Sequence, residues 1–172
     1  MAKTRTNIFL VGPMGAGKST VGKRLARSLG LEFHDSDRAL EQRTGVDIPV
    51  IFEYEGEEGF RRREKAIMDE LTAREGIVLA TGGGAVLDPD NRRHLAARGT
   101  VVYMQTSVDK QFDRTRHDTT RPLLQTDDPR ARLAEIAAER EPLYREIADI
   151  IVSTDQGGIR GLVQDILDQL PD

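Results

Sequence analysis

Short apolar runs alternate with longer amphipathic segments along most of the chain. Five of these runs have the length and composition of buried β-strands, at 7–11, 31–35, 76–80, 100–104 and 149–153. The run at 31–35 is the weakest, because it contains only two apolar residues. Strands that alternate with helices are typical of a parallel sheet with crossover helices. We therefore expect a three-layer α/β fold, in which a five-stranded parallel sheet lies between two layers of helices.

Apolar residues three or four positions apart predict the helices of this fold. The first helix is expected at 18–29, where Gly30 provides the glycine that often follows a helix. The others are expected at 46–54, 57–74, 91–98, 108–116, 129–148 and 159–170. At 172 residues, the chain has the length of one domain.

Two segments depart from the alternation of strands and helices. Residues 38–75 are helical in pattern throughout, and residues 117–128 are polar and contain Pro122. We expect the first segment to be a substrate-binding excursion and the second to be a lid. Surface elaboration is the alternative for both segments.

The composition favours a cytoplasmic protein that binds a small anion. The chain has no cysteine, so it has neither disulfides nor thiolate metal sites. It also has no apolar run near the ~20 residues of a membrane-spanning helix, and no signal-peptide pattern. A net charge of −4 argues against nucleic acid as a partner. Arginines nevertheless cluster near 61–63, 114–121 and 140–145, where surface ion pairs are the alternative to anion binding.

Residues 12–19, GPMGAGKS, carry the clearest chemical signal. They lie between a strand and a helix and match the Walker A pattern. Glycines in such a loop allow backbone N–H groups to surround phosphates at a helix N-terminus. We expect the Lys18 ammonium to reach the β- and γ-phosphates and the Ser19 hydroxyl to bind Mg²⁺. The chain lacks the Asn-Lys-x-Asp motif of a GTPase, and strand 76–80 ends in glycines rather than in the carboxylate of a motor ATPase.

Acidic residues and glycines follow two other strands. Asp35 and Asp37 come after the second strand, and Gly82-Gly83-Gly84 come after the third. Carboxyl ends of parallel strands meet at one edge of a sheet, so these groups should converge on the Walker loop. In an extended chain both carboxylates would face the crevice, but either aspartate could instead cap the next helix. The glycines either present N–H groups to a ligand or form an ordinary turn.

Arginines are the remaining candidates for the site. The run 61–63 fans out around a helix, so only one or two of its side chains can face the crevice. Arg140 lies near Pro142, which we expect to interrupt or kink its helix and so favour an inward side chain. A surface salt bridge with a neighbouring glutamate is the alternative. Phosphoryl transfer depends on positioning and charge stabilisation, so such residues suffice for a kinase.

These motifs resemble the shikimate kinases in order and spacing. The resemblance covers about residues 5–170 and rests on GPMGAGKST, DSD, GEEGFRRRE, ATGGGAV, TTRPLL and EREPLYREIAD. It implies a P-loop fold like that of nucleoside monophosphate kinases. It also implies that a monomer uses ATP and Mg²⁺ to convert shikimate to 3-phosphoshikimate in aromatic amino-acid biosynthesis.

The resemblance also implies roles for individual residues. Asp37 would bind the shikimate hydroxyls and accept a proton, while Arg61, Arg140 and the Gly83 N–H would hold the carboxylate. Arg121 would reach the transferring phosphate from the lid, and Asp35 would order the Mg²⁺ shell beside Ser19. Lys18, Asp37 and Arg121 are thus the catalytic candidates. The nucleotide would contact Gly15, Ala16, Gly17, Lys18, Ser19, Thr20, Arg114, Arg121 and Gln156.

Three alternatives remain at this stage. A gluconate-type kinase shares the phosphate loop and the size, but it would lack the same set of arginine, aspartate and glycine residues. A nucleoside monophosphate kinase would need a base-sized pocket within 38–75. A non-enzymatic ATP-binding switch would not turn over ATP in response to a small acceptor.

Overall fold

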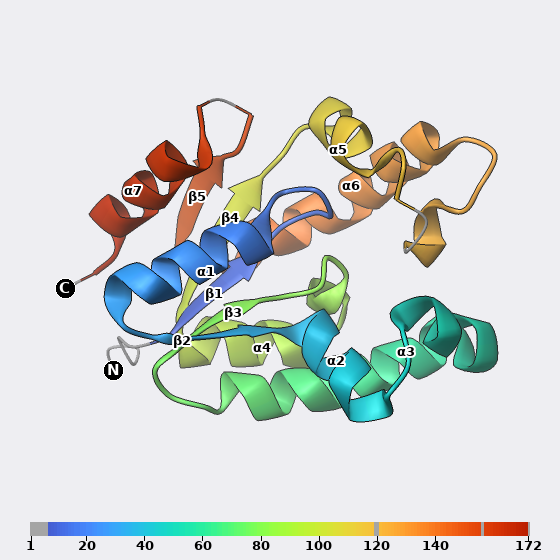
Figure 1. Cartoon of the computed structure of the whole chain (residues 1–172), viewed down its shortest axis with the longest axis horizontal. Helices are drawn as coiled ribbons and strands as arrows, with labels where there is room; N and C mark the ends of the chain where they lie inside the picture. Colours follow the sequence, from blue (N-terminus) through green and yellow to red (C-terminus); the bar gives the residue numbers. More distant parts are fainter. Residues whose placement is uncertain (1–6, 119–120, 156, 172) are drawn as a thin grey trace.

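A five-stranded parallel sheet forms the centre of the structure (Figure 1). The structure, a computed structural model, describes residues 7–118, 121–155 and 157–171. The strands are β1 (Ile8–Val11), β2 (Glu32–Asp35), β3 (Ile77–Ala80), β4 (Thr100–Gln105) and β5 (Ile150–Ser153). Their order is β2-β3-β1-β4-β5, and every neighbouring pair is parallel. Each predicted strand is confirmed to within one residue at either end.

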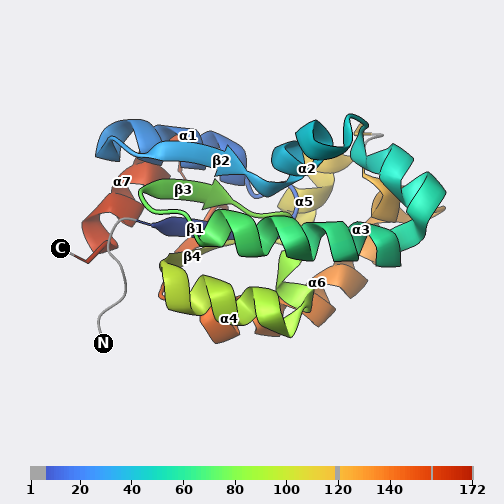
Figure 2. The ribbon, with the colours of Figure 1, turned by 90° about the horizontal axis from the view of Figure 1, so that it is seen from below.

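Helices cover both faces of this sheet, as Figure 2 shows. Side chains alternate along a strand, so Ile8 and Leu10 of β1 face one helical layer, whereas Phe9 and Val11 face the other. The first layer contains α1 (Lys18–Leu29) and α7 (Ile159–Gln169). The second contains α3 (Ile48–Thr72), α4 (Pro89–Arg98) and α6 (Pro129–Ile147). The three-layer α/β fold is therefore confirmed.

The region that follows β2 differs from the prediction at its start and agrees with it further on. Helix α2 (Ser36–Thr44) begins directly after β2, because the Asp35 carboxylate caps it by accepting the N–H groups of Asp37 and Arg38. The expected extended chain through residue 37 is therefore wrong. The two helices expected at 46–54 and 57–74 are both present within α3, and the expected break between them is confirmed, because the backbone is not helical at Gly56. The φ of 72° at Gly56 is one that glycine adopts readily.

Two shorter elements and α5 complete the described chain. Helix α5 (Val108–Thr115) precedes the segment expected to be a lid, and the short 3₁₀ helices are η1 (Ala85–Leu87) and η2 (Pro122–Leu124). Arg121 is extended, as expected for a residue before proline. Among the residues that the structure describes, no helix combines the length and hydrophobicity needed to cross a bilayer.

Helix α6 does not break at Pro142. It continues from Pro129 to Ile147, so the single helix expected at 129–148 is confirmed, and of the two effects expected of Pro142 the interruption is wrong. Proline removes one N–H donor from a helix. In α6, however, residues before and after Pro142 are buried, either in the core cluster beneath the sheet or against Leu124 of the lid segment. Those buried residues are Leu133, Ile136, Arg140, Tyr144 and Ile147. Their packing holds α6 in one piece.

The turn into β4 depends on the absence of a side chain at Gly99. A Cβ atom there would lie 2.7 Å from the Phe9 ring and 2.9 Å from Asn7 Cβ. Both neighbours are buried, and the Asn7 side chain is held by hydrogen bonds to the carbonyl of Arg74 and the N–H of Ile77. A methyl group at this position would displace the start of the central strand.

We expect Gly99→Ala to lower the free energy of unfolding by about 1–3 kcal/mol, because it overpacks a rigid core site. Gly161→Ala in α7 is the matched control, since its added Cβ would meet no atom within 4 Å. Alanine favours the helical backbone over glycine, so the control should gain about 0.5–1 kcal/mol. Urea unfolding of both variants tests this. A Gly99→Ala variant as stable as Gly161→Ala would show that the close approach at Gly99 is unimportant.

Candidate active site

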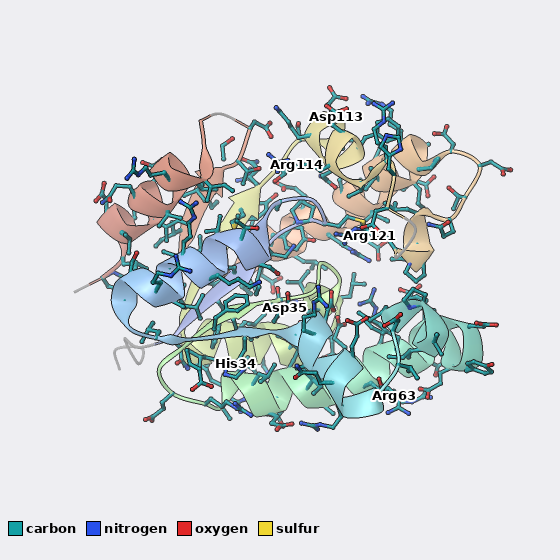
Figure 3. All side chains as sticks on the ribbon, viewed as in Figure 1. His34, Asp35, Arg63, Asp113, Arg114 and Arg121 are labelled. Carbon is teal, nitrogen blue, oxygen red and sulfur yellow. The ribbon has the colours of Figure 1, made fainter. Side chains whose placement is uncertain are left out.

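The carboxyl ends of β1, β2 and β3 open into a cavity of about 600 Å³, which we call the donor cavity. Its walls combine the Walker loop with both aspartates and the glycine loop, so the predicted convergence is confirmed. Figure 3 shows Asp35 and Arg121 on opposite sides of this region. The predicted site residues on its wall are Gly15, Gly17, Lys18, Ser19, Thr20, Asp35, Asp37, Gly83, Arg114 and Arg121.

The Walker loop places a cation at the floor of the donor cavity. Gly15 and Gly17 adopt positive φ angles of 81° and 87°, which glycine tolerates best. The Lys18 ammonium donates to the carbonyl oxygens of Gly12 and Pro13 at 2.6 and 2.8 Å. Burial lowers the pKa of Lys18 to about 8, an effect that the nearby Asp37 carboxylate opposes. Ala16 is buried beneath the loop.

The Asp35 carboxylate both caps the next helix and faces the donor cavity, the two roles that the sequence offered as alternatives. One oxygen caps α2, and the other accepts the Ser19 hydroxyl at 2.5 Å. This contact joins the start of α1 to the end of β2. It also places a hydroxyl and a carboxylate side by side on the wall of the donor cavity.

A smaller cavity of about 90 Å³, which we call the acceptor cavity, adjoins the donor cavity. Arg61 of α3 and Arg140 of α6 line it. The neighbours of Arg61 face elsewhere: Arg62 pairs with Glu58, and Arg63 pairs with Glu55, both at the protein surface. The two cavities share Met14, Asp37, Ile48, Gly82, Gly83 and Arg121 as lining residues.

The two arginines of the acceptor cavity have unused donors. Only 4% of Arg140 is exposed, so the surface-salt-bridge alternative for this residue is wrong. The Nε atoms of both Arg61 and Arg140 are buried and have no hydrogen-bond partner among the described residues. Buried donors without partners are unfavourable. They mark a place that suits an anion.

Glu64 is a site residue that the sequence analysis missed. Its carboxylate pairs with the Arg61 guanidinium at 2.8 Å, and only 2% of the residue is exposed. Burial raises the pKa of Glu64 to about 7, although the Arg61 charge opposes this shift. The spacing of Arg61 and Glu64, three residues apart on one helix, is the signal that could have indicated the pair.

Asp37 lies at the boundary between the two cavities. Burial raises its pKa to about 6, the Asp35 carboxylate adds to this shift, and the Lys18 ammonium opposes it. Because α2 begins at Ser36, Asp37 reaches the site from the first turn of a helix rather than from an extended chain.

The glycine loop after β3 is not an ordinary turn. A Cβ atom on Gly82 would lie 2.7 Å from an Asp37 carboxylate oxygen and 3.0 Å from one of Glu64. A Cβ atom on Gly84 would lie 2.4 Å from the Arg61 guanidinium. Neither glycine has a positive φ, so the requirement is for space rather than for backbone conformation.

Further polar contacts hold the edges of the site. Arg121 donates to the Asp118 carboxylate at 3.0 Å while lining both cavities. Arg114 donates to the Gly15 carbonyl at 2.6 Å, which places it beside the Walker loop. Gln156, the other residue predicted to contact the nucleotide, lies outside the described residues. Ser36, which the sequence analysis did not single out, accepts the Gly82 N–H at 2.9 Å.

Comparisons with known proteins identify close relatives. Residues 14–171 match the model of the shikimate kinase family. A shikimate kinase of Halorhodospira halophila is 62% identical over 98% of this chain and 95% of its own length. The structure of an Acinetobacter baumannii shikimate kinase in complex with shikimate superposes with a TM-score of 0.94 at 53% identity, covering 96% of this chain and 93% of that chain. A gluconokinase of Sinorhizobium meliloti, at 18% identity, 98% and 99% coverage and a TM-score of 0.56, shares the fold alone.

The raised pKa of Glu64 predicts a specific pH dependence of stability. A carboxyl group whose pKa is higher in the folded than in the unfolded chain holds its proton more tightly when folded. Stability therefore falls as the pH rises from 4.5, the ordinary value, to about 7. Relative to Glu64→Gln, the wild-type protein should lose up to about 3 kcal/mol across this interval.

Urea unfolding of both proteins at several pH values measures this difference. Glu58→Gln is the matched control, because Glu58 lies on the same helix with its side chain exposed. The control should follow the pH dependence of the wild type. A difference between wild type and Glu64→Gln that stays constant with pH would contradict the prediction.

Proposed function

Because the chain belongs to the shikimate kinase family, we propose that it transfers the γ-phosphoryl group of ATP to a hydroxyl group of shikimate. The product is 3-phosphoshikimate, an intermediate of aromatic amino-acid biosynthesis. The observation that carries the proposal is the pair of adjoining cavities. One contains the Walker loop, the other contains the buried Arg140 and the partly buried Arg61, and Asp37 and Arg121 line both.

ATP occupies the donor cavity in this proposal. The backbone of Gly15–Thr20 surrounds the phosphates, and the Lys18 ammonium binds the β- and γ-phosphates. Arg114 lies beside the Walker loop, where it can contact the adenine. Gln156 is proposed for the same role on the basis of the family resemblance.

The donor cavity also suits Mg²⁺. This ion prefers oxygen ligands and is commonly held by one or two protein groups together with phosphates and water. Ser19 and Asp35 offer a hydroxyl and a carboxylate in contact with each other on the cavity wall. When bound with ATP, Mg²⁺ neutralises charge on the β- and γ-phosphates. We propose Ser19 as its ligand and Asp35 as the group that orders its water shell.

Shikimate occupies the acceptor cavity. Guanidinium groups match carboxylates in charge and geometry, and the free Nε donors of Arg61 and Arg140 support a carboxylate between them. The Gly83 N–H adds a backbone donor at the wall that both cavities share. The shikimate hydroxyls then lie toward Asp37.

Phosphoryl transfer takes place at this shared wall. The acceptor oxygen forms a bond to the γ-phosphorus as the bond to the β–γ bridging oxygen breaks, leaving ADP. The proton of the acceptor hydroxyl passes to the Asp37 carboxylate, whose raised pKa makes it a better base than an ordinary aspartate. Lys18 and Arg121 stabilise the negative charge on the transferring group.

The segments 38–75 and 117–128 complete the proposal. The first contributes Ile48, Phe52, Phe60 and Arg61 to the acceptor cavity, which supports a substrate-binding role. The second contributes Arg121, Pro122 and Leu123, which supports its role as a lid. A closed lid would exclude water, which otherwise competes with shikimate for the phosphoryl group.

We also infer that the protein acts as a monomer in the cytoplasm. All of the proposed contacts to both substrates come from one chain, which supports a monomer. The lack of cysteine and the use of ATP fit the cytoplasm.

An assay of ADP release tests the proposed function. The purified protein is given ATP and Mg²⁺ with shikimate, gluconate or AMP as the acceptor. We expect turnover with shikimate alone. Gluconate is included because the Sinorhizobium meliloti gluconokinase shares the fold, and turnover with gluconate or AMP but not with shikimate would overturn the assignment.

The carboxylate site predicts a contrast among four arginines. Arg61→Ala and Arg140→Ala should each weaken shikimate binding by about 2–5 kcal/mol, because each removes a buried partner of the carboxylate. The affinity for ATP should change little. Arg62→Ala and Arg63→Ala are the controls, because their pairs with Glu58 and Glu55 lie at the surface. Similar shikimate affinities for all four variants, measured by calorimetry, would exclude the site.

The proposed contact of Arg121 with the transferring phosphate predicts that its removal slows the chemical step. Arg121→Ala should lower kcat by about 10³-fold or more, as expected when an arginine at the transferring phosphate is removed, with little change in the affinity for ADP. Arg116→Ala, which alters an exposed arginine at the end of α5, is the control. Hydrogen exchange within 117–128 should slow when ADP and shikimate bind together. Full activity of Arg121→Ala would remove Arg121 from the mechanism.

A further inference from the structure

Tyr144 connects helix α6 to the glycine loop. Its hydroxyl donates to the Gly83 carbonyl at 2.7 Å, and only 2% of the residue is exposed. The ring stacks on that of Tyr103, with centroids 5.1 Å apart. Burial raises the pKa of Tyr144 to about 12, although the adjacent Arg140 guanidinium opposes this shift, so the hydroxyl keeps its proton and remains a donor at neutral pH. The roles proposed above do not include this side chain.

The hydrogen bond acts on a loop that has two free donors. The Gly82 N–H donates to Ser36, and the Gly82 carbonyl accepts the Ala85 N–H at 3.0 Å. Within the described part of the chain, the N–H groups of Gly83 and Gly84 donate to no protein acceptor. Both residues line the acceptor cavity.

The geometry of a peptide unit links these donors to Tyr144. In a trans peptide the carbonyl and the following N–H point in opposite directions. The bond from Tyr144 to the Gly83 carbonyl therefore sets the direction of the Gly84 N–H. It also limits the rotation of Gly83, whose backbone has no Cβ atom to restrict it. Ser36 and Ala85 hold the two preceding peptide units, 81–82 and 82–83 respectively, so Tyr144 completes the support of the loop.

Tyr144 also relates the loop to Arg140. The two residues are four positions apart on α6 and so lie on the same face of the helix. A Cβ atom on Gly83 would lie 3.5 Å from an Arg140 Nη atom, which shows how close the loop and the guanidinium are. The Tyr144 hydrogen bond thus holds the glycine loop, which forms one wall of the acceptor cavity, at a set position relative to the Arg140 guanidinium on the other wall.

We propose that Tyr144 is a positioning residue for the substrate carboxylate, which acts through the Gly83 carbonyl to orient the Gly84 N–H toward the acceptor cavity beside Arg140. The inference rests on the proposed function and adds to it a residue that never touches substrate. The loss of the hydroxyl would leave the loop free to rotate. It would therefore weaken the binding of shikimate rather than that of ATP.

Tyr144→Phe tests this inference, and Tyr103→Phe is the matched control. Tyr103 is equally buried and stacks on Tyr144, but its hydroxyl donates to Glu141 and does not contact the glycine loop. Both variants keep the aromatic ring and hence the packing. We expect Tyr144→Phe to raise KM for shikimate and the Kd measured by calorimetry about tenfold, the effect of losing one buried hydrogen bond. KM for ATP should change less than twofold, and kcat should change little.

The outcomes distinguish a failure of the role inferred for Tyr144 from a failure of the proposed function. A selective increase in KM for shikimate in Tyr144→Phe, absent from Tyr103→Phe, would support the positioning role. Equal KM values for shikimate in the two variants would overturn it, and so would a parallel rise of both KM values in Tyr144→Phe, since that indicates a general disturbance. A wild-type protein without shikimate-dependent ADP release would overturn the proposed function as well. Urea unfolding of both variants checks that their stabilities match.

Discussion

The close approach of charged side chains to bare backbone at Gly82–Gly84 is the constraint on which the site depends. Asp37 and Glu64 both approach the space beside Gly82, and the Arg61 guanidinium fills the space beside Gly84. Three charged groups from α2 and α3 can therefore lie against the end of a buried strand. Any side chain at these two positions would push them apart. The contact also explains why the two cavities share a wall instead of being separated by packed side chains.

The buried charged side chains around this loop lower the stability of the folded protein. Glu64 and Asp37 have raised pKa values because burial disfavours their charged forms, and the pKa of Lys18 is lowered for the same reason. The unpartnered Nε donors of Arg61 and Arg140 are a further unfavourable feature. The apolar clusters on both faces of the sheet offset this, because α1, α3 and α6 each bury apolar side chains against it. Shifted pKa values of this kind cluster at functional sites.

Much of this arrangement could be predicted from the sequence, because it depends on local signals. The strands were located to within one residue by short apolar runs, and the Walker loop by its glycines, lysine and serine. The end of β2 was harder to predict, because Asp35 both caps α2 and contacts Ser19, and the pattern DSD does not show where the extended chain stops. The sequence also does not show that α6 continues through Pro142, because the packing of α6 outweighs the loss of one hydrogen bond.

Tertiary contacts account for the site residues that the sequence did not indicate. The partner of Tyr144 is a backbone carbonyl 61 positions away, and that of Ser36 is an N–H 46 positions away. Neither motif periodicity nor composition encodes such pairings, since a carbonyl group is present at every residue. A search for polar residues near predicted loops would have included both, but only the folded chain selects them.

The fold itself does not decide which acceptor is phosphorylated. A gluconokinase with 18% identity shares the fold, and one fold can host several functions, so the fold alone does not fix the acceptor. What differs between such kinases must lie in the side chains that face the acceptor. In this chain the acceptor cavity is lined by side chains of α2, α3, α6 and residues 121–123, and by the backbone of the glycine loop that follows β3. In the proposed function, specificity for a carboxylate comes from two arginines placed around a loop without side chains, and the use of ATP comes from a motif of eight residues. The two properties are therefore separable by substitution, although they share one wall.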